Sequence, residues 1–242
     1  MRETVEVLLH KLSRREFRQR MQSGELKACI IPVAAIEQHL EHLSMEHDWR
    51  SVMLVAEAAA RALQPDVLVA AGVMAGVSEH HMNHPGTLTL RPGTFLSVVE
   101  DLIDSAVRAG FTNVLVLNGH GGNIVPCQAA WDQFVRRAQV NLQFLSYFEL
   151  LTAADTDLLE SGKEIPKNLP GHAQEFETAV AMAAFPENVR LDALGDQDDP
   201  TPAMATAAKG KEYLQRINTR LVTYLREMID GTRVAEIPPF HP

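Results

Sequence analysis

The chain alternates short apolar runs with longer amphipathic segments. The apolar runs occupy residues 28–34, 67–73, 114–117 and 141–147, and polar or turn-forming residues bound each of them. Short apolar runs with such boundaries are typical of strands that are buried on both faces of a sheet. We therefore predict four core strands at these positions.

Segments with helical character lie between and after these runs. Residues 48–63 are rich in alanine and other good helix formers, and in 94–109 apolar side chains recur near the helical period. Further helices are predicted at 124–138, near Glu175 and at 206–229. Alternating strands and helices favour an α/β fold, here a single-domain three-layer α/β/α sandwich with a mostly parallel central sheet.

The length of 242 residues fits one domain, 1–242, rather than several. Glycine and prolines punctuate the polar segment 149–171, which we predict to be an ordered loop or lid. The acidic, breaker-rich stretch 192–202 is predicted to be a surface connection.

Composition excludes several classes of function. A formal net charge of -9 and 6% aromatic residues leave no basic stripe or stacking platform for nucleic acid. No apolar run is long enough to span a bilayer, and the N-terminal sequence lacks the apolar core of a signal peptide, so we expect a cytoplasmic protein. Cys29 and Cys127 have no metal-type or disulfide spacing and are expected to be buried small hydrophobes.

The histidines are clustered. Eight of the ten lie around 39–48, 80–84, 120 and 172. Each cluster follows a predicted strand or the predicted lid, and the carboxyl ends of parallel strands form the ligand crevice of such sheets. The clusters can therefore meet in one place, and their residue types indicate a metal site.

The first cluster contains Glu37-Gln-His39 and Asp48. In an extended segment, residues two apart project to the same face, so Glu37 and His39 can address a shared or adjacent metal. Asp48 adds a third ligand type, although a helix N-cap explains it equally well. Glu41, Glu46 and His47 are interpreted as solvated loop residues.

The sequence Asn118-Gly-His120-Gly-Gly-Asn123 places a histidine between glycines at a strand-to-helix turn. Backbone N–H groups at such a turn can approach a ligand closely, so Gly121 and Gly122 are candidate substrate contacts. A tight turn alone would explain the glycines but not His120.

Two further loops carry candidate chemistry. Ser78 begins a segment with three histidines at a strand exit, where substrate contact and a polar turn are both possible. His172 precedes Glu175 and Glu177, which offer ligands or ordinary first-turn acids on a helix.

At these residues the chain resembles the creatininase family of metal-dependent amidohydrolases, over most of positions 28–185. The first cluster is similar to the family's first metal loop and Gly76–Thr87 to its substrate loop. The segments Asn118–Asn123 and His172–Thr178 are similar to its glycine-asparagine and histidine-acid motifs.

The resemblance implies two divalent metal ions. Glu37 and His120 would hold one ion, His39 and a carboxylate the other, and Asp48 would bridge them. The resemblance also implies that Ser78 contacts substrate and that the chain forms a homo-oligomer, possibly a hexamer.

The sequence departs from the family pattern at several positions. Leu40-Glu41 replaces a usual Gly-Pro, Ser44 replaces a proline and Gln174 a glycine. Gly122 stands where creatininase has a glutamate ligand, so the second-site carboxylate must come from elsewhere, and we favour Glu177 over Glu175. The lid lacks the tryptophans that cover creatinine, so creatinine is not the expected main substrate.

Imidazole and carboxylate ligands without thiolates suit zinc, manganese or iron, with zinc as the default. The expected reaction is hydrolysis of a non-peptide C–N bond in a small amide, cyclic amide or formamide by a metal-activated water. His172 is the expected proton donor to the leaving nitrogen, and Glu177 is also counted as catalytic. The alternatives are a relative that trims a short precursor peptide in cofactor maturation and a non-catalytic binding protein with a degenerate site.

Overall fold

Four parallel strands form the central sheet, in the order β2-β1-β3-β4. The computed structural model describes residues 5–162, 169–237 and 239. The strands are β1 (Ala28–Val33), β2 (Val67–Val69), β3 (Asn113–Asn118) and β4 (Asn141–Ser146).

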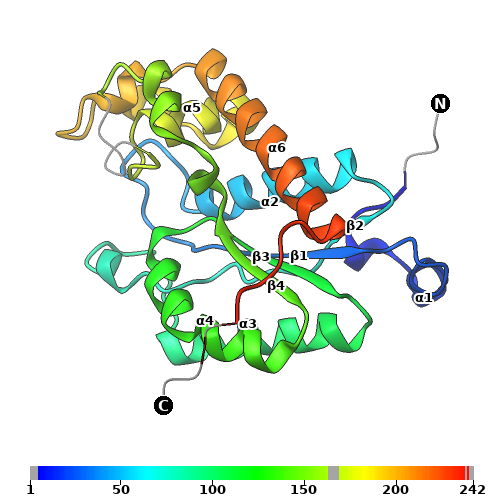
Figure 1. Ribbon diagram of the computed structural model, residues 1–242. Coiled ribbons are helices and arrows are strands. Elements are labelled where there is room, and N and C mark those ends of the chain that lie inside the picture. Colours follow the sequence, from blue (N-terminus) through cyan, green and yellow to red (C-terminus); the bar gives the residue numbers. More distant parts are fainter. Residues whose placement is uncertain (1–4, 163–168, 238, 240–242) are drawn as a thin grey trace.

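Helices cover both faces of this sheet (Figure 1). One face carries α2 (His47–Ala62), α5 (Glu175–Ala184) and α6 (Ala207–Asp230), and the other carries α3 (Pro92–Arg108) and α4 (Ile124–Ala138). The short helix α1 (Arg14–Gln22) lies near one end of the sheet (Figure 1).

Successive residues of each strand enter different cores. Ile30 and Leu115 pack with α2, α5 and α6, whereas Ile31 and Val116 pack with α3 and α4. This division follows from the alternation of side chains along a strand. The predicted three-layer α/β/α sandwich with a parallel sheet is confirmed, and the assignment of all 242 residues to one domain stays a prediction.

The predicted strand 67–73 is too long. Regular pairing of β2 ends at Val69, and the chain then rejoins β1 through a single bridge between Val33 and Val73. Gly72 passes so close to Pro32 that a Cβ on this glycine would lie 2.2 Å from the Pro32 carbonyl oxygen. Close backbone approach at a glycine explains why the ladder breaks here.

The predicted lid, 149–171, overlaps the end of a 3₁₀ helix at Tyr147–Leu150 and contains a second at Ala153–Leu158. Residues 163–168 of this prediction lie outside the described residues. The predicted surface connection 192–202 overlaps short 3₁₀ helices at Leu191–Ala193 and Thr201–Met204. Among the described residues, none of the helices is both long and apolar enough to cross a membrane.

The strand order creates the site. From β1 the chain crosses to β2 on one side, and β3 lies on the other side of β1. A crevice forms at the carboxyl ends of two strands where connections diverge in this way. The loop after β1 carries Glu37 and His39, and the turn after β3 carries His120, so the fold brings the first and third histidine clusters together.

Candidate metal centre

Two buried histidines turn one ring nitrogen toward carboxylates and the other toward the backbone. His39 bonds through Nδ1 to the Glu37 carbonyl at 3.1 Å, and its Nε2 lies 3.1 Å from Asp48 Oδ1. His120 bonds through Nε2 to the Val77 carbonyl at 3.0 Å, and its Nδ1 lies 3.0 Å from Asp48 Oδ2. The carbonyls hold the ring protons, so the nitrogens that face Asp48 carry lone pairs in the neutral rings.

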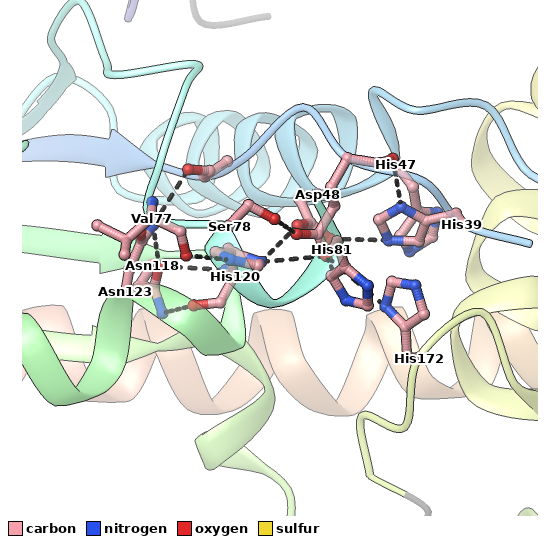
Figure 2. Close-up of polar contacts among 12 residues, drawn as sticks. His39, His47, Asp48, Val77, Ser78, His81, Asn118, His120, Asn123 and His172 are labelled. Atoms are coloured by element: carbon pink, nitrogen blue, oxygen red, sulfur yellow. Dashed lines mark hydrogen bonds and ion pairs between the residues drawn. The ribbon is translucent and has the colours of Figure 1, made fainter. Parts of the chain in front are cut away.

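Asp48 lies between these two histidines (Figure 2). It occupies the first turn of α2, which begins at His47 and has Glu46 as its N-cap. The capping interpretation of Asp48 is therefore wrong, because its carboxylate faces the histidines instead of the helix N–H groups. Asp48 is 3% exposed, so its carboxylate is shielded from solvent and has these two imidazoles as partners.

Glu37 is the second buried carboxylate of the cluster. Its Oε1 lies 3.3 Å from His120 Nδ1 and 3.6 Å from His172 Nδ1. Its Oε2 accepts a hydrogen bond from the Ser78 hydroxyl. Ser78 is fully buried, so in this structure its hydroxyl orients Glu37, and the predicted substrate contact by Ser78 stays a prediction.

Asparagine amides fix the turn that carries His120 (Figure 2). Asn118 accepts from the His120 backbone N–H at 3.1 Å and donates to the His120 carbonyl at 2.7 Å. Asn123 donates to Asn118 Oδ1 at 3.1 Å and accepts from the Val77 N–H at 2.9 Å. The two asparagines thereby tie the β3 turn to the Val77 segment, and this orients the His120 ring.

The shifted pKa values of the site indicate that its buried carboxylates require positive charge beside them. Burial alone would lower the histidine pKa values, but Asp48 and the other carboxylates raise the pKa of His39 to about 9 and that of His120 to about 10. Burial opposes ionisation of Asp48, yet His39 and His120 hold its pKa well below the usual range. Burial raises the pKa of Glu177 to about 8 despite the nearby His39.

These side chains fit a divalent metal. A lone pair that faces a buried carboxylate oxygen at about 3 Å is unfavourable unless a proton or a cation lies between them. Imidazole and carboxylate donors suit zinc or manganese, and a backbone acceptor on the far ring nitrogen is usual for a metal-bound histidine. Glu37, His39 and Asp48 have ligand atoms within 4.8 Å of one another, as do His39, His172 and Glu177.

Comparison with known proteins places the chain in a family. A family model described as creatinine amidohydrolase matches residues 10–210. The chain belongs to the creatininase family.

Three relatives with assigned names show how varied similar proteins are. Creatinine amidohydrolase of Pseudomonas putida is 26% identical over 208 residues, which cover 81% of this chain and 78% of that protein. A 3-dehydro-scyllo-inosose hydrolase of Thermotoga maritima is 28% identical over 75% of this chain and 57% of its own length. A mycofactocin precursor peptide peptidase of Mycolicibacterium smegmatis is 27% identical over 68% of this chain and 61% of its own length.

Solved creatininases share the fold. A mutant creatininase of the Zn-Zn type superposes with a TM-score of 0.79 at 24% identity, covering 92% of this chain and 98% of that one. A creatininase described as the Mn form has the same TM-score, identity and coverage.

The space around Gly122 explains why a glycine stands where creatininase has a glutamate ligand. A Cβ at this position would lie 2.1 Å from the Val77 carbonyl oxygen and 2.5 Å from His120 Nε2. The turn therefore has no room for a glutamate side chain without a shift of the backbone. A Cβ at Gly121 would meet no atom within 4 Å, and this residue is exposed. The substrate contacts expected for Gly121 and Gly122 stay predictions.

The two candidate carboxylates of α5 have different surroundings. Glu177 Oε2 lies 3.8 Å from His39 Nε2 and accepts a hydrogen bond from the Ala173 N–H at 2.6 Å. Glu175 instead accepts from Lys209 Nζ at 2.7 Å and from the Ser161 N–H at 2.8 Å. Of the two, Glu177 reaches the cluster and Glu175 ties the lid segment to α6.

This contrast predicts different effects of two matched substitutions. Glu177→Gln is expected to lower the metal content by about one ion per chain, because the amide removes a charged oxygen donor beside His39. Glu175→Gln is expected to keep the metal and to lower the melting temperature, because it weakens the ion pair with Lys209. Elemental analysis and thermal melts of both variants test this; loss of metal in Glu175→Gln alone would reverse the assignment.

The raised histidine pKa values predict proton release on metal binding. Near pH 7 both His39, with a pKa of about 9, and His120, with a pKa of about 10, carry a proton that a metal must displace. About two protons per fully loaded chain are therefore expected to be released, with a further contribution from Glu177, whose pKa burial raises. Zinc affinity should rise with pH near neutrality and level off above these values. Calorimetry in buffers of different ionisation enthalpy measures the release; a value near zero would contradict it.

Sequence reasoning missed several residues of the site. His47 was interpreted as a solvated loop residue, but it is 1% exposed and its ring centroid lies 5.0 Å from that of His39. His42 is buried with Nε2 2.8 Å from Thr178 Oγ1. His172 was predicted as a site residue, but its partner His81 was not singled out from its loop; the two rings stack with centroids 4.2 Å apart (Figure 2). Clustering of histidines in the sequence was the one available signal for these contacts.

One residue in the loop between His39 and Asp48 has a backbone conformation that is typical of glycine. Leu40 has φ 54, in the left-handed region that favours glycine, at the position where creatininases usually have one. In this conformation the Leu40 N–H donates to Gln38 Oε1 at 3.0 Å. The loop thus folds back on Gln38, whose side chain touches the histidines of the site.

Proposed function

We propose that the protein is a metal-dependent hydrolase of a C–N bond in a small amide, cyclic amide or formamide other than creatinine. The observation that carries the proposal is Asp48, whose two oxygens face His39 Nε2 and His120 Nδ1 at 3.1 and 3.0 Å. A carboxylate that joins two separate imidazoles is suited to bridge two cations.

The ligand assignment follows the contacts. Glu37, His120 and Asp48 would hold one divalent ion, and His39, Glu177 and Asp48 the other, with zinc, manganese and iron as the candidates. When bound, such ions lower the pKa of a coordinated water and polarise a substrate carbonyl. Names of relatives support a hydrolase, since creatinine amidohydrolase and a precursor peptide peptidase are both similar to this chain.

His172 is proposed as the catalytic residue beside the ligands. Its Nδ1 lies 3.6 Å from Glu37 Oε1, so a substrate held at the cluster would meet this nitrogen. Burial and the positive His39 lower the pKa of His172 to about 3, which keeps the ring neutral before the reaction. Glu177, as a proposed second-site ligand, also orders the start of α5 through the Ala173 N–H.

Replacing His172 with alanine is expected to lower kcat by about 10²–10⁴-fold, the usual contribution of one proton-transferring or charge-stabilising group. Metal content should stay at the wild-type value, because Glu37, His39, Asp48, His120 and Glu177 remain. Steady-state kinetics and elemental analysis of one preparation measure both effects. Wild-type kcat in the variant would remove His172 from the mechanism.

One observation favours a second candidate, the trimming of a short peptide. A cleft of about 680 Å³ beside the cluster is lined by Gln38 and by the acidic residues Glu41, Asp196, Asp198 and Asp199. This volume exceeds what a small cyclic amide needs and lies within the range of sites for larger ligands. Homo-oligomerisation stays a prediction.

A substrate panel tests the proposal. Metal-stripped protein would be reloaded with zinc, manganese or iron and assayed with creatinine, small amides, cyclic amides, formamides and short peptides. The expected result is metal-dependent hydrolysis of a non-peptide amide and little turnover of creatinine. Preferred hydrolysis of peptides would support the second candidate, and no turnover by a metal-replete protein would support a binding protein.

A further inference from the structure

The histidines of the site fall into two groups that differ in their outer hydrogen bonds. His39 and His120 bond through their outer ring nitrogens to backbone carbonyls. His81 and His172 instead contact the side-chain amide nitrogen of Gln38, through His81 Nδ1 and His172 Nε2, each at 2.8 Å. A carbonyl can only accept and an amide nitrogen can only donate, so the two groups hold their ring protons on opposite sides.

The orientation of the Gln38 amide is fixed by a third contact. Gln38 Oε1 accepts the Leu40 N–H at 3.0 Å, which the left-handed Leu40 directs back toward it. Rotating the amide by 180° would place its NH₂ group against this N–H and leave the Leu40 donor without a partner, which is unfavourable. The nitrogen of Gln38 therefore faces the two rings, and its two protons match the two acceptors.

The consequence is a defined tautomer for each ring. In a neutral imidazole one nitrogen donates and the other accepts. Because His172 Nε2 and His81 Nδ1 accept from Gln38, the protons lie on His172 Nδ1 and His81 Nε2. These N–H groups face Glu37 Oε1 at 3.6 and 3.7 Å, too far for a good hydrogen bond to it. Both N–H groups are thus left available on the side of the metal cluster.

We propose that Gln38 is a positioning residue that holds His81 and His172 as neutral N–H donors rather than metal ligands. The inference rests on the proposed function and refines it: a substrate at the cluster would receive hydrogen bonds from both rings where negative charge develops. Preorganised donors of this kind stabilise oxyanions, and neutral histidines are known to serve in this way. In this proposal the neutral His172 donates a hydrogen bond instead of transferring a proton as a general acid. His81 becomes a second catalytic residue.

The geometry also decides between two uses of Glu37, His81 and His172. Their ligand atoms lie within 4.8 Å of one another and would suit a further metal ion. Binding a metal at His81 Nε2 and His172 Nδ1 would move both ring protons onto the nitrogens that face the Gln38 amide. Two N–H groups would then oppose an NH₂ group, so the Gln38 contact disfavours an ion there.

The test is the tautomer of each ring, measured by long-range ¹H–¹⁵N correlation spectra of zinc-loaded protein with ¹⁵N-labelled histidine. His81→Ala and His172→Ala assign the signals. We expect protonated Nδ1 in His172 and protonated Nε2 in His81. Gln38→Glu has the same shape but can only accept, so both tautomers should reverse; Gln38→Met keeps the length without hydrogen bonds and should give mixtures.

Zinc content provides a second readout. His81→Ala and His172→Ala should bind as much zinc per chain as wild type, and loss of an ion in either would overturn the proposal. Wild-type rings with the opposite tautomers, or tautomers that Gln38→Glu leaves unchanged, would also overturn it. If wild type binds no zinc, the proposed function fails, while the tautomers of the metal-free protein still decide the role of Gln38.

Discussion

Replacing His120 with alanine is expected to remove bound metal and hydrolytic activity together. His120 Nδ1 lies 3.0 Å from Asp48 and 3.3 Å from Glu37, so its loss removes one imidazole partner from each of two buried carboxylates. Metal ions contribute several kcal/mol to hydrolysis, and at 1.36 kcal/mol per factor of ten this is at least about 1,000-fold in rate. Elemental analysis and kinetics on one preparation measure both losses.

His10→Ala is the control for this experiment. His10 is exposed and belongs to none of the four histidine clusters, so the variant should keep wild-type metal and kcat. Circular dichroism of both variants separates unfolding from loss of the site. A folded His120→Ala protein that is metal-replete and fully active would remove His120 from the proposed centre.

The second large effect is expected for Asp48→Asn. The substitution keeps the side-chain shape but removes the negative charge between His39 and His120. Without this anion the pKa of each histidine should fall, and the metal content should drop from near two to one ion or fewer per chain. Elemental analysis and histidine NMR titration of the metal-free variant measure these changes.

Stability of the metal-free proteins gives an independent readout for Asp48→Asn. The raised pKa values of His39, about 9, and His120, about 10, stabilise the wild-type fold below the unfolded histidine value of 6.5. This contribution is lost as the pH rises through about 9 to 10. Asp48→Asn should therefore be less stable than wild type at pH 6. This difference in the free energy of unfolding should be smaller at pH 10.

Asp66→Asn serves as the matched control. Asp66 is partly exposed and pairs with Lys27 at 3.3 Å, away from the cluster. Surface pairs of this kind contribute about 0–1 kcal/mol, so metal content and pH dependence should match wild type. If Asp48→Asn retained two ions per chain, Asp48 would not be the bridging ligand.

Much of the fold follows from local sequence patterns. The helix predicted at 124–138 coincides with α4, because its apolar period is regular and glycines precede it. The strand predicted at 67–73 was too long, because apolar composition does not reveal where Gly72 must approach Pro32. Helix α2 begins at His47, one residue before the predicted start, and this shift changes Asp48 from a cap to a residue of the site.

The site was predictable only as far as its residues cluster in sequence. Strand ends predicted that Glu37, His39 and His120 would meet, since parallel strands bring their carboxyl ends to one edge. The contact between Gln38 and His172 joins residues 134 positions apart and has no local signature. The burial of His47 was missed because it depends on how α2 packs beside His39.

The most direct test of the account is the number of metal ions bound per folded chain, measured by elemental analysis on protein purified without added metal. The contacts of Asp48 with His39 and His120 predict near two equivalents per chain. The same measurement after dialysis against zinc, manganese or iron covers loss during purification. A metal content near zero under all of these conditions, in a folded protein, would contradict a binuclear hydrolase centre.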